Sequence, residues 1–593
     1  MEKIAAIGAL GALAQDNRLD VFRLLVEAGP KGMAAGQVAT ALALPPNTLS
    51  FHFDRLRQAG LVSVRREGRS LIYAARYETM NALLAYLTAN CCSGPPEACP
   101  PAACPPTVPR RRKGSAVNPH DPLNELPVAI IGAGPVGLAA AANLVGRGLA
   151  VRIYESGESA AANVLAWAHV RLFSPWRFNL DPAAAALLAD ERWTAPPEDE
   201  LPTGRELYDR YLAPLAATPR IQEALRTRTR VVAIARQGLD KLVSRDRGDR
   251  PFALRLESAA GPRTELARAV IDASGTWKQP NPMGADGLPA IGEARFSERI
   301  AYGVPDVLGR ARETYAGRRV AVIGGGHSAA NALLDLARLA EREPAMQLVW
   351  AVRSRDLTRV FGGGAGDQLP ARGKLGSDLK ALVAGQRLRL VTGFSAQAVE
   401  ERGDGLVVSG RTSEGQATLG PVDRIVVATG QRPDLALTQE LRLDLDPWLE
   451  CPRALGPEID PNLHSCGSVP PHGYRELAHP EPGFFTAGVK SYGRAPTFLM
   501  ATGYEQVRSI AAYLAGDLTA ANDVRLVLPE TGVCSADFLE TGTAEAGCCG
   551  GPAPAEVEAC CAADAQAKAE AKSGCGCSPR TAPEASVQLG LRI

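Results

Sequence analysis

Two kinds of hydrophobic pattern follow one another along this chain. Over residues 1–90, apolar residues recur at helical spacing, as in LDVFRLL and NTLSFHFDRLRQAGLV, and a short basic hairpin signal, RREGRSLIYAA, follows them. From about residue 126 to 518, apolar runs typical of buried strands alternate with helical segments. The pattern predicts an N-terminal helical module with a hairpin, and then a larger α/β part with parallel sheets.

Two segments lack such patterns. Residues 93–125 are rich in Pro, Gly and Ser and include PRRRKG, a composition typical of a linker that cannot pack a core. Residues 530–593 are dominated by Ala, Gly, Pro and Cys, with few large apolar side chains. We expect this tail to order only around a bound metal.

Composition limits the classes of partner. The chain has 593 residues, 46% of them hydrophobic, which is enough for about three or four domains. Lys plus Arg number 65 and Asp plus Glu number 64, so no global field draws the chain to nucleic acid or membrane, and a DNA contact must come from a local patch. No apolar run reaches the roughly 18 residues of a membrane span, and we expect a cytoplasmic protein without a membrane partner.

A dinucleotide-binding motif opens the α/β part. PVAIIGAGPVGLAAAANLVGRGLAVRIYES reads as a strand, a G-x-G-x-x-G turn, a helix and a second strand that ends at Glu155. The glycines are Gly132, Gly134 and Gly137. They permit a tight turn and close approach of a pyrophosphate, and the acid lies at the spacing that binds a ribose hydroxyl. This motif predicts a dinucleotide-binding site.

A second copy of the motif lies at RRVAVIGGGHSAANALLDLARL, with Gly324, Gly326 and Ala329 at the three positions. The strand that follows ends with Arg353 and Arg355, where an acid would select NAD. Guanidinium groups there favour the 2′-phosphate of NADP, although they could also be solvated charges at a strand end. We therefore predict an NADPH site. His327 in the turn is a candidate acid, but side chains at this position usually pack against the cofactor.

Further segments resemble two-dinucleotide-domain flavoproteins. IDASGTWKQP and RIVVATGQRPD are similar to the strands at which the chain crosses between the domains, and GFFTAGVKSYGRAPTFLMATGYEQVRSI is similar to the terminal FAD-contacting strand and helix. Ala487 and Gly488 replace the Gly-Asp pair of many disulfide reductases. The resemblance implies an NADPH domain inserted into an FAD domain.

The sequence identifies the acceptor of the flavin's electrons less directly than it identifies the cofactors. Disulfide-reducing relatives carry a C-x-x-C before the second glycine motif or a C-x-x-x-x-C after the first, and neither is present at those places, so reduced flavin passes electrons to oxygen or directly to a substrate. The core is similar in this respect to flavin-dependent monooxygenases of arsenic-resistance operons. Tyr492 and Arg494 are candidates for positions near the flavin, but the sequence identifies no catalytic acid–base set.

The N-terminal module resembles the ArsR/SmtB family of metalloid-responsive winged-helix repressors. LAQDNRLDVFRLL matches the opening helices of that family and NTLSFHFDRLRQAGLV its recognition helix. The resemblance implies operator DNA as a partner and a homodimer formed through this module. By the same resemblance Asn47, Ser50 and His52 face DNA, and Arg65, Arg66 and Arg69 contact its backbone. A winged helix used only for packing is the alternative.

Of the thirteen cysteines, eleven cluster on either side of the α/β part. Cys91, Cys92 and Cys99 fit the thiolate layout of As(III)-sensing members of the repressor family, with Cys104 as a spare ligand. The tail adds Cys548, Cys549, Cys560, Cys561, Cys575 and Cys577, paired thiols that suit a thiophilic ion. Incidental or redox-buffering thiols are the alternative for both clusters. Cys451 and Cys466 are either core residues or a relay.

The predicted fold class is α/β multidomain: a winged helix-turn-helix, a two-Rossmann-domain FAD/NAD(P) flavoprotein and a flexible Cys-rich tail. The predicted domains are a winged helix at 1–92, a linker at 93–125, an FAD domain at 126–315 and 429–518, an NADPH domain at 316–428, and a metalloid-binding tail at 530–593. We expect an As(III)-responsive repressor fused to a monooxygenase-like enzyme that oxidises trivalent arsenicals, either inorganic or methylated. A redox- or metalloid-sensing regulator without turnover, and an NADPH-dependent reductase of an external disulfide or quinone, are the alternatives.

Overall fold

The computed structural model describes residues 3–29, 31–42, 46–67, 70–88, 122–462, 469–496 and 498–526. The chain forms two compact units that divide after Gly114, within the predicted linker. Within the described ranges, no helix combines the length and the apolar character that a bilayer span requires. Each unit is described by itself below.

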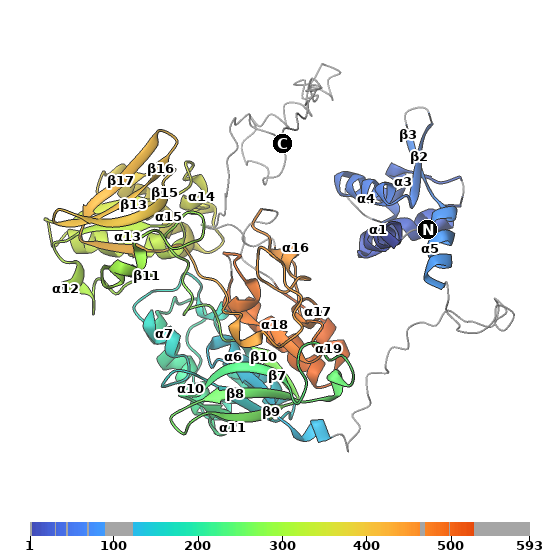
Figure 1. Cartoon of the computed structure of the whole chain (residues 1–593), viewed down its shortest axis with the longest axis horizontal. Coiled ribbons are helices and arrows are strands. Elements are labelled where there is room, and N and C mark those ends of the chain that lie inside the picture. The colour runs from blue at the N-terminus through green and yellow to red at the C-terminus, as the bar shows by residue number, and fades with distance from the viewer. Residues whose placement is uncertain are drawn as a thin grey trace, which may run out of the picture. The chain divides into compact units, whose positions relative to one another are not determined.

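The first unit is a winged helix-turn-helix (Figure 1). Its core forms where apolar residues of the helices meet, including Val21, Leu25, Leu49, Phe53 and Leu56. Strands β2 and β3 pair antiparallel as the hairpin that the basic segment predicts. The elements are α1 (Lys3–Leu13), α2 (Asp16–Ala28), β1 (Met33–Ala34), α3 (Ala35–Ala41), α4 (Pro46–Gln58), β2 (Val62–Glu67), β3 (Ser70–Ala75) and α5 (Tyr77–Thr88).

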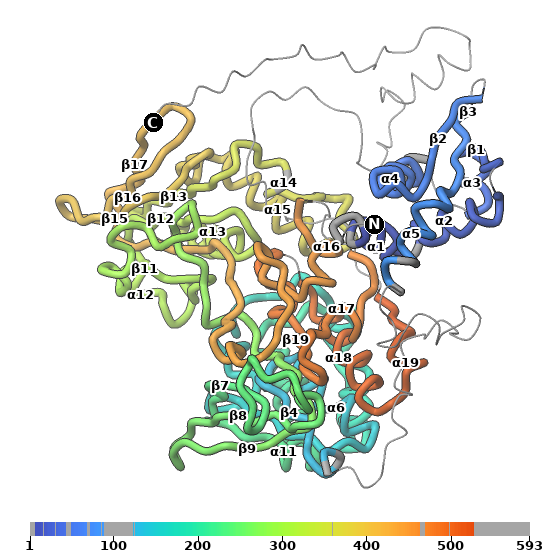
Figure 2. Tube along the Cα trace, turned by 45° about the vertical axis from the view of Figure 1, so that its right-hand side comes forward, coloured from blue at the N-terminus to red at the C-terminus, as the bar shows by residue number. Residues whose placement is uncertain are grey.

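The second unit contains two parallel five-stranded sheets, each with a three-stranded antiparallel sheet. The FAD-type sheet has the order β19-β10-β4-β5-β6. Its strands are β4 (Val128–Ile131), β5 (Val151–Tyr154), β6 (Leu225–Arg226), β10 (Ala269–Asp272) and β19 (Phe484–Thr486). Since β19 pairs with β10, the chain returns to this sheet after it has built the second domain (Figure 2). The predicted insertion of one dinucleotide domain into the other is therefore present.

The second parallel sheet has the order β11-β18-β12-β13-β14. Its strands are β11 (Ile300–Tyr302), β12 (Arg319–Ile323), β13 (Gln347–Ala351), β14 (Arg389–Val391) and β18 (Arg424–Val427). Because β11 pairs with β18, this domain begins before residue 300, and the predicted start at 316 is too late. The short edge strand β11 precedes the glycine motif and carries no motif of its own, so the sequence pattern did not show it.

The antiparallel sheets and the helices complete the unit. One antiparallel sheet joins β7 (Arg230–Arg236), β8 (Phe252–Glu257) and β9 (Arg263–Ala267), and the other joins β15 (Ser395–Arg402), β16 (Gly405–Thr412) and β17 (Gly415–Val422). The longer helices are α6 (Pro135–Gly146), α8 (Pro182–Ala189), α13 (His327–Ala340), α15 (Pro370–Ala384) and α18 (Met500–Leu514). Helix α18 packs on α6, where a Cβ built on Gly503 would lie 2.4 Å from Cγ2 of Val136. This contact brings α18 to the first glycine turn.

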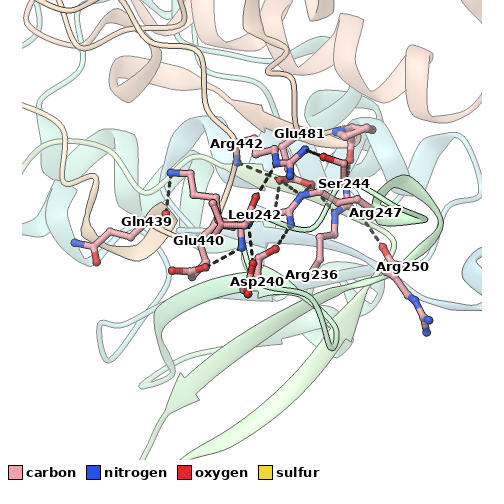
Figure 3. Close-up of polar contacts among 12 residues, drawn as sticks. Arg236, Asp240, Leu242, Ser244, Arg247, Arg250, Gln439, Glu440, Arg442 and Glu481 are labelled. Carbon is pink, nitrogen blue, oxygen red and sulfur yellow. Dashed lines mark hydrogen bonds and ion pairs between the residues drawn. The ribbon is translucent and has the colours of Figure 1, made fainter.

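A buried ionic network ties the β7–β9 sheet to later segments (Figure 3). The carboxylate of Glu481 accepts hydrogen bonds from Nε of Arg236 at 2.7 Å and from Nε and Nη2 of Arg247 at 2.9 and 2.8 Å. All three side chains are at most 4% exposed. Arg247 also donates to the carbonyls of Asp240 and Glu440, so the network spans three segments that are far apart in sequence.

Candidate functional site

The first glycine turn joins β4 to α6 and leaves room for a diphosphate. Gly132 has a φ of +93°, in the left-handed region, and a Cβ on Gly137 would lie 1.9 Å from the Gly132 carbonyl oxygen. Only glycine allows α6 to pack this closely against the turn. Gly134 caps α6, and no heavy atom lies within 4 Å of a Cβ built on it. The free space and the helix N-terminus together fit the pyrophosphate of a dinucleotide.

Glu155 lies at the end of β5, next to this turn. Its Oε2 accepts a hydrogen bond from the backbone N–H of Ala133 at 3.0 Å, and its Oε1 accepts one from the N–H of Gly157 at 2.6 Å. These bonds fix the orientation of the carboxylate beside the glycine turn. Oε1 also accepts from Oγ of Ser156 at 3.5 Å, whereas Oε2 keeps a lone pair for a further donor, so the carboxylate fits the ribose hydroxyl of FAD.

The second glycine turn has the same construction. Gly324 has a φ of +138°, and a Cβ there would lie 2.1 Å from the carbonyl oxygen of Ala428. Gly326 caps α13 with open space around it, and Ala329 is fully buried where α13 packs. The structure therefore brings all three predicted residues to one turn that fits a second dinucleotide.

Arg353 and Arg355 follow β13 at the edge of the sheet where this turn lies. Both are exposed. Nη1 of Arg353 donates to the carbonyl of Ala285 at 3.1 Å, and the side chain of Arg355 lies 3.3 Å from a Cβ built on Gly393. Recognition of the 2′-phosphate of NADPH by these two residues stays a prediction.

His327 stands at the start of α13, against Phe173 of the FAD-type domain. The two ring centroids are 4.8 Å apart, and the buried Nε2 of His327 has no hydrogen-bond partner among the described residues. Burial, and secondly the charge of Arg372, lower the pKa of His327 to about 4. The imidazole is therefore neutral at physiological pH and is not a proton donor there.

Two buried polar groups beside the FAD-type turn were not identified from the sequence. Nζ of Lys490 lies 2.7 Å from Oδ2 of Asp272 and donates to Oγ of Ser274 at 3.0 Å, and both members of the ion pair are 1% exposed. This pair joins the end of β10 to the segment after β19. A lysine in the otherwise apolar run GFFTAGVKSYG is the signal that could have revealed it.

The second group centres on Gln506 of α18. Its Oε1 accepts from the N–H of Gly488 at 2.8 Å, and its Nε2 contacts Oγ of Ser491 at 2.9 Å and Nε2 of His472 at 3.0 Å. Nδ1 of His472 faces the carbonyl of Pro470 at 3.0 Å, which requires a proton on Nδ1 and leaves Nε2 as the acceptor. Burial lowers the pKa of His472, so this imidazole is a fixed neutral bridge.

The structure corrects one predicted DNA contact. His52 is only 5% exposed, and both of its ring nitrogens lack partners among the described residues. Leu49, His52, Phe53 and Leu56 have the i, i+3, i+4, i+7 spacing of one helix face, and that face is buried. The prediction that His52 faces DNA is therefore wrong. Burial, and then the charge of Arg18, lower the pKa of this imidazole.

The other predicted DNA contacts lie on the surface or outside the described side chains. Ser50, Arg65 and Arg66 are exposed. Nε of Arg65 pairs with Glu67 at 2.8 Å. The side chain of Asn47 and the whole of Arg69 lie outside the described residues.

The predicted thiol ligands cannot be placed. Cys91, Cys92 and Cys99, with Cys548, Cys549, Cys560, Cys561, Cys575 and Cys577, lie outside the described residues, as does Cys466. Among the described residues, no group of three or more His, Cys, Asp or Glu side chains has the arrangement of a metal site. Cys451 is fully buried, and burial raises the pKa of its thiol to about 12, so it is a core residue and not a relay.

Comparison with protein families gives two matches. The profile described as "Helix-turn-helix domain" matches residues 13–65, and that described as "Pyridine nucleotide-disulphide oxidoreductase" matches residues 126–469.

Individual proteins resemble one part or the other. The HTH-type transcriptional regulator YceK of Bacillus subtilis is 33% identical over 73 residues, which are 12% of this chain and 72% of that protein. The HTH-type transcriptional regulator YgaV of Escherichia coli is 30% identical over 86 residues, 14% of this chain and 83% of that protein. Among solved structures, bacillithiol disulfide reductase Bdr from Bacillus cereus aligns with 66% of this chain and 99% of its own, at 18% identity and a TM-score of 0.48.

Proposed function

Since the chain belongs to the pyridine nucleotide-disulphide oxidoreductase family over residues 126–469 and carries an N-terminal helix-turn-helix domain, we propose that it combines arsenic sensing with arsenical oxidation. The proposed enzyme uses NADPH, FAD and oxygen to oxidise a trivalent arsenical, either arsenite or a methylated form. The proposed repressor, of ArsR/SmtB type, releases operator DNA when As(III) binds its thiols.

The distribution of cysteines carries this proposal. No cysteine lies between residues 105 and 450, a stretch that contains both glycine turns. Cys451, the first one after it, is buried with a raised thiol pKa. A dithiol relay within this stretch is therefore excluded, and reduced flavin passes its electrons to oxygen or directly to a substrate instead. Vicinal thiols before and after the core suit a soft trivalent metalloid better than a hard ion.

The residues of the first turn fit FAD. Gly134 and the first N–H groups of α6 would hold its diphosphate, and Glu155 its ribose. FAD supplies the exchange of hydride equivalents that no side chain of this chain offers. The ion pair of Lys490 with Asp272 and the Gln506 network hold the surrounding segments in place. The imidazole of His472 is neutral at physiological pH, so it does not act as an acid there.

We also propose that the repressor module forms a homodimer through α1 and α5. Leu10 on α1 is 43% exposed, and Leu84 and Leu87 on α5 are 53% and 52% exposed. Exposed leucines on neighbouring helices favour burial against a second copy. Sedimentation of the full-length protein tests this point, since a monomer at micromolar concentration would contradict it.

Substitution of Cys91 and Cys92 by serine is expected to abolish the release of operator DNA by As(III). A hydroxyl is a poor ligand for a thiophilic centre, while the DNA-contacting face of the module is unchanged. Fluorescence anisotropy with operator DNA measures the As(III) concentration at half release. A Cys466→Ser variant is the control, and release from Cys91→Ser/Cys92→Ser at the wild-type As(III) concentration would remove the sensing proposal.

The family match favours one second candidate. Because the chain matches a disulphide oxidoreductase family, the second candidate is an NADPH-dependent reductase that acts on an external disulfide or quinone. Such an enzyme turns over without oxygen, whereas the proposed oxidation needs it. Comparison of aerobic and anaerobic NADPH oxidation therefore separates the two candidates.

A further inference from the structure

Three arginines from separate segments meet at one surface loop of the second unit. Arg353 follows β13 of the NADPH-type domain, and Arg432 follows β18, where the chain crosses back to the FAD-type domain. Arg494 lies between β19 and α18 of the FAD-type domain. The loop comprises residues 285–287. Because the three arginines come from both domains and the connection between them, anything bound by all three would bridge the domains.

Backbone contacts and close approach define the cluster. Nη1 of Arg353 donates to the carbonyl of Ala285 at 3.1 Å, and Nη2 of Arg432 donates to the carbonyl of Gly287 at 3.1 Å. A Cβ built on Gly287 would lie 3.6 Å from Nη2 of Arg494 and 3.9 Å from Nη2 of Arg432. The guanidinium groups of Arg432 and Arg494 therefore converge on the same point of the loop.

The connection between the domains holds Arg432 in place. Its Nε donates to Oδ1 of Asn281 at 2.9 Å, and its backbone N–H donates to the carbonyl of Gln279 at 3.0 Å. Residues 280 and 431 form a β-bridge between the two crossing strands. Arg432 is thus pre-oriented, which lowers the entropic cost of binding an anion.

The positive charges in this cluster are not neutralised by ion pairs that involve Arg432 or Arg494. Among the described residues, neither forms a salt bridge, and the side chain of Arg494 has no hydrogen-bond acceptor. Desolvation, and secondly the charge of Arg494, lower the pKa of Arg353. The loop has one carboxylate, Asp286, whose Oδ1 accepts from the N–H of Leu288 at 3.1 Å. The like charges of Arg432 and Arg494 repel each other at this separation, and an anion between them would relieve the repulsion.

We propose that Arg353, Arg432 and Arg494 form a binding site for a phosphate-type oxyanion. Planar guanidinium groups bind such anions with paired N–H donors, and three of them around one loop match a tetrahedral group. The anion is either the 2′-phosphate of NADPH or a free oxyanion of the same shape. With a free oxyanion the site goes beyond the proposed function, whereas with the 2′-phosphate it deepens that function and rests on its use of NADPH. In neither case does occupancy depend on whether an arsenical is oxidised.

The experiment measures binding to the oxidised, FAD-loaded, full-length protein by isothermal titration calorimetry, without turnover. The probes are inorganic phosphate, adenosine 2′,5′-bisphosphate and 5′-AMP. Arg432→Gln and Arg494→Gln are compared with Arg411→Gln, an exposed arginine on β16 in the same domain as Arg353. Equal flavin absorbance and thermal midpoints show that the variants are folded, and Arg494→Lys tests whether charge alone restores binding.

We expect Arg432→Gln and Arg494→Gln to weaken binding at least tenfold, and Arg411→Gln to leave it unchanged. If the two variants bind adenosine 2′,5′-bisphosphate more weakly than the wild type does, but bind 5′-AMP equally well, the 2′-phosphate is the ligand. Weaker binding of inorganic phosphate, with the bisphosphate unaffected, identifies a free oxyanion. Wild-type affinity of both variants for both phosphate probes, or the absence of saturable binding of either probe to the wild type, would overturn the proposal.

Discussion

Gly137→Ala is expected to abolish FAD binding, with a loss of affinity of roughly hundredfold or more, equivalent to about 2.7 kcal/mol. The added methyl carbon would lie 1.9 Å from the Gly132 carbonyl oxygen, which is backbone and cannot rotate away. Helix α6 must therefore move away from the turn, so its first N–H groups no longer point toward the diphosphate. The measurement is the flavin content of the purified protein and the dissociation constant from flavin fluorescence quenching.

Gly146→Ala is the matched control for this variant. Gly146 ends the same helix, and no heavy atom lies within 4 Å of a Cβ built on it. Alanine is also the better helix former by about 1 kcal/mol, so we expect full FAD content and unchanged or higher stability. Wild-type FAD affinity in Gly137→Ala would show that the turn does not hold the cofactor.

Glu481→Gln is expected to lower the free energy of unfolding of the FAD-type domain by about 3–5 kcal/mol, because it leaves two buried guanidinium groups without a counter-charge. Glutamine keeps the shape of the side chain and one acceptor, so the effect reports the charge. The guanidinium of Arg236 is held over the Phe252 ring at 3.7 Å and is buried, so it cannot turn to solvent. Urea unfolding followed by flavin release measures the change.

The effect has a defined dependence on pH. Burial alone would raise the pKa of Glu481, but hydrogen bonds from Arg247 and Arg236 hold it below its usual range. A carboxylate with a lowered pKa stabilises the fold above the unfolded value of about 4.3, and that contribution is lost as the pH falls through the lower, folded value. The difference in the free energy of unfolding between wild type and Glu481→Gln is therefore expected to stay constant from pH 6 to 8 and to become smaller in acid.

Glu401→Gln provides the comparison at an exposed ion pair. Glu401 pairs with Arg299 at 2.9 Å, but its side chain is 54% exposed. A surface pair contributes about 0–1 kcal/mol, so the substitution is expected to change stability little. Equal losses in Glu401→Gln and Glu481→Gln would contradict a special role of the buried network.

The sequence predicts those parts of the fold and site in which the chemistry is local. Gly132, Gly137 and Gly324 occur in short motifs whose spacing requires the strand–turn–helix that the structure contains. Glu155 follows from its place at the end of the next strand. For these residues, the segments that must pack together lie within about 25 residues along the chain, so a short sequence motif is enough to predict the site.

Contacts between distant segments follow no such pattern. Lys490 and Asp272 are 218 residues apart, and Arg236 and Glu481 are 245 apart, so only the folded sheet brings their charges together. The convergence of Arg432 and Arg494 depends on the crossing strands in the same way. His52 is a different case, because its helical periodicity with Leu49, Phe53 and Leu56 indicates burial, whereas the family resemblance implies a contact with DNA.

The most direct test of the proposed function is oxygen and NADPH consumption by the FAD-loaded full-length protein, with and without arsenite or methylarsenite, while pentavalent product is followed. We expect a trivalent arsenical to stimulate both consumptions and to appear as pentavalent product in matching amount, only in the presence of oxygen. NADPH consumption that is unaffected by either arsenical, with no pentavalent product, would contradict the proposed oxidation.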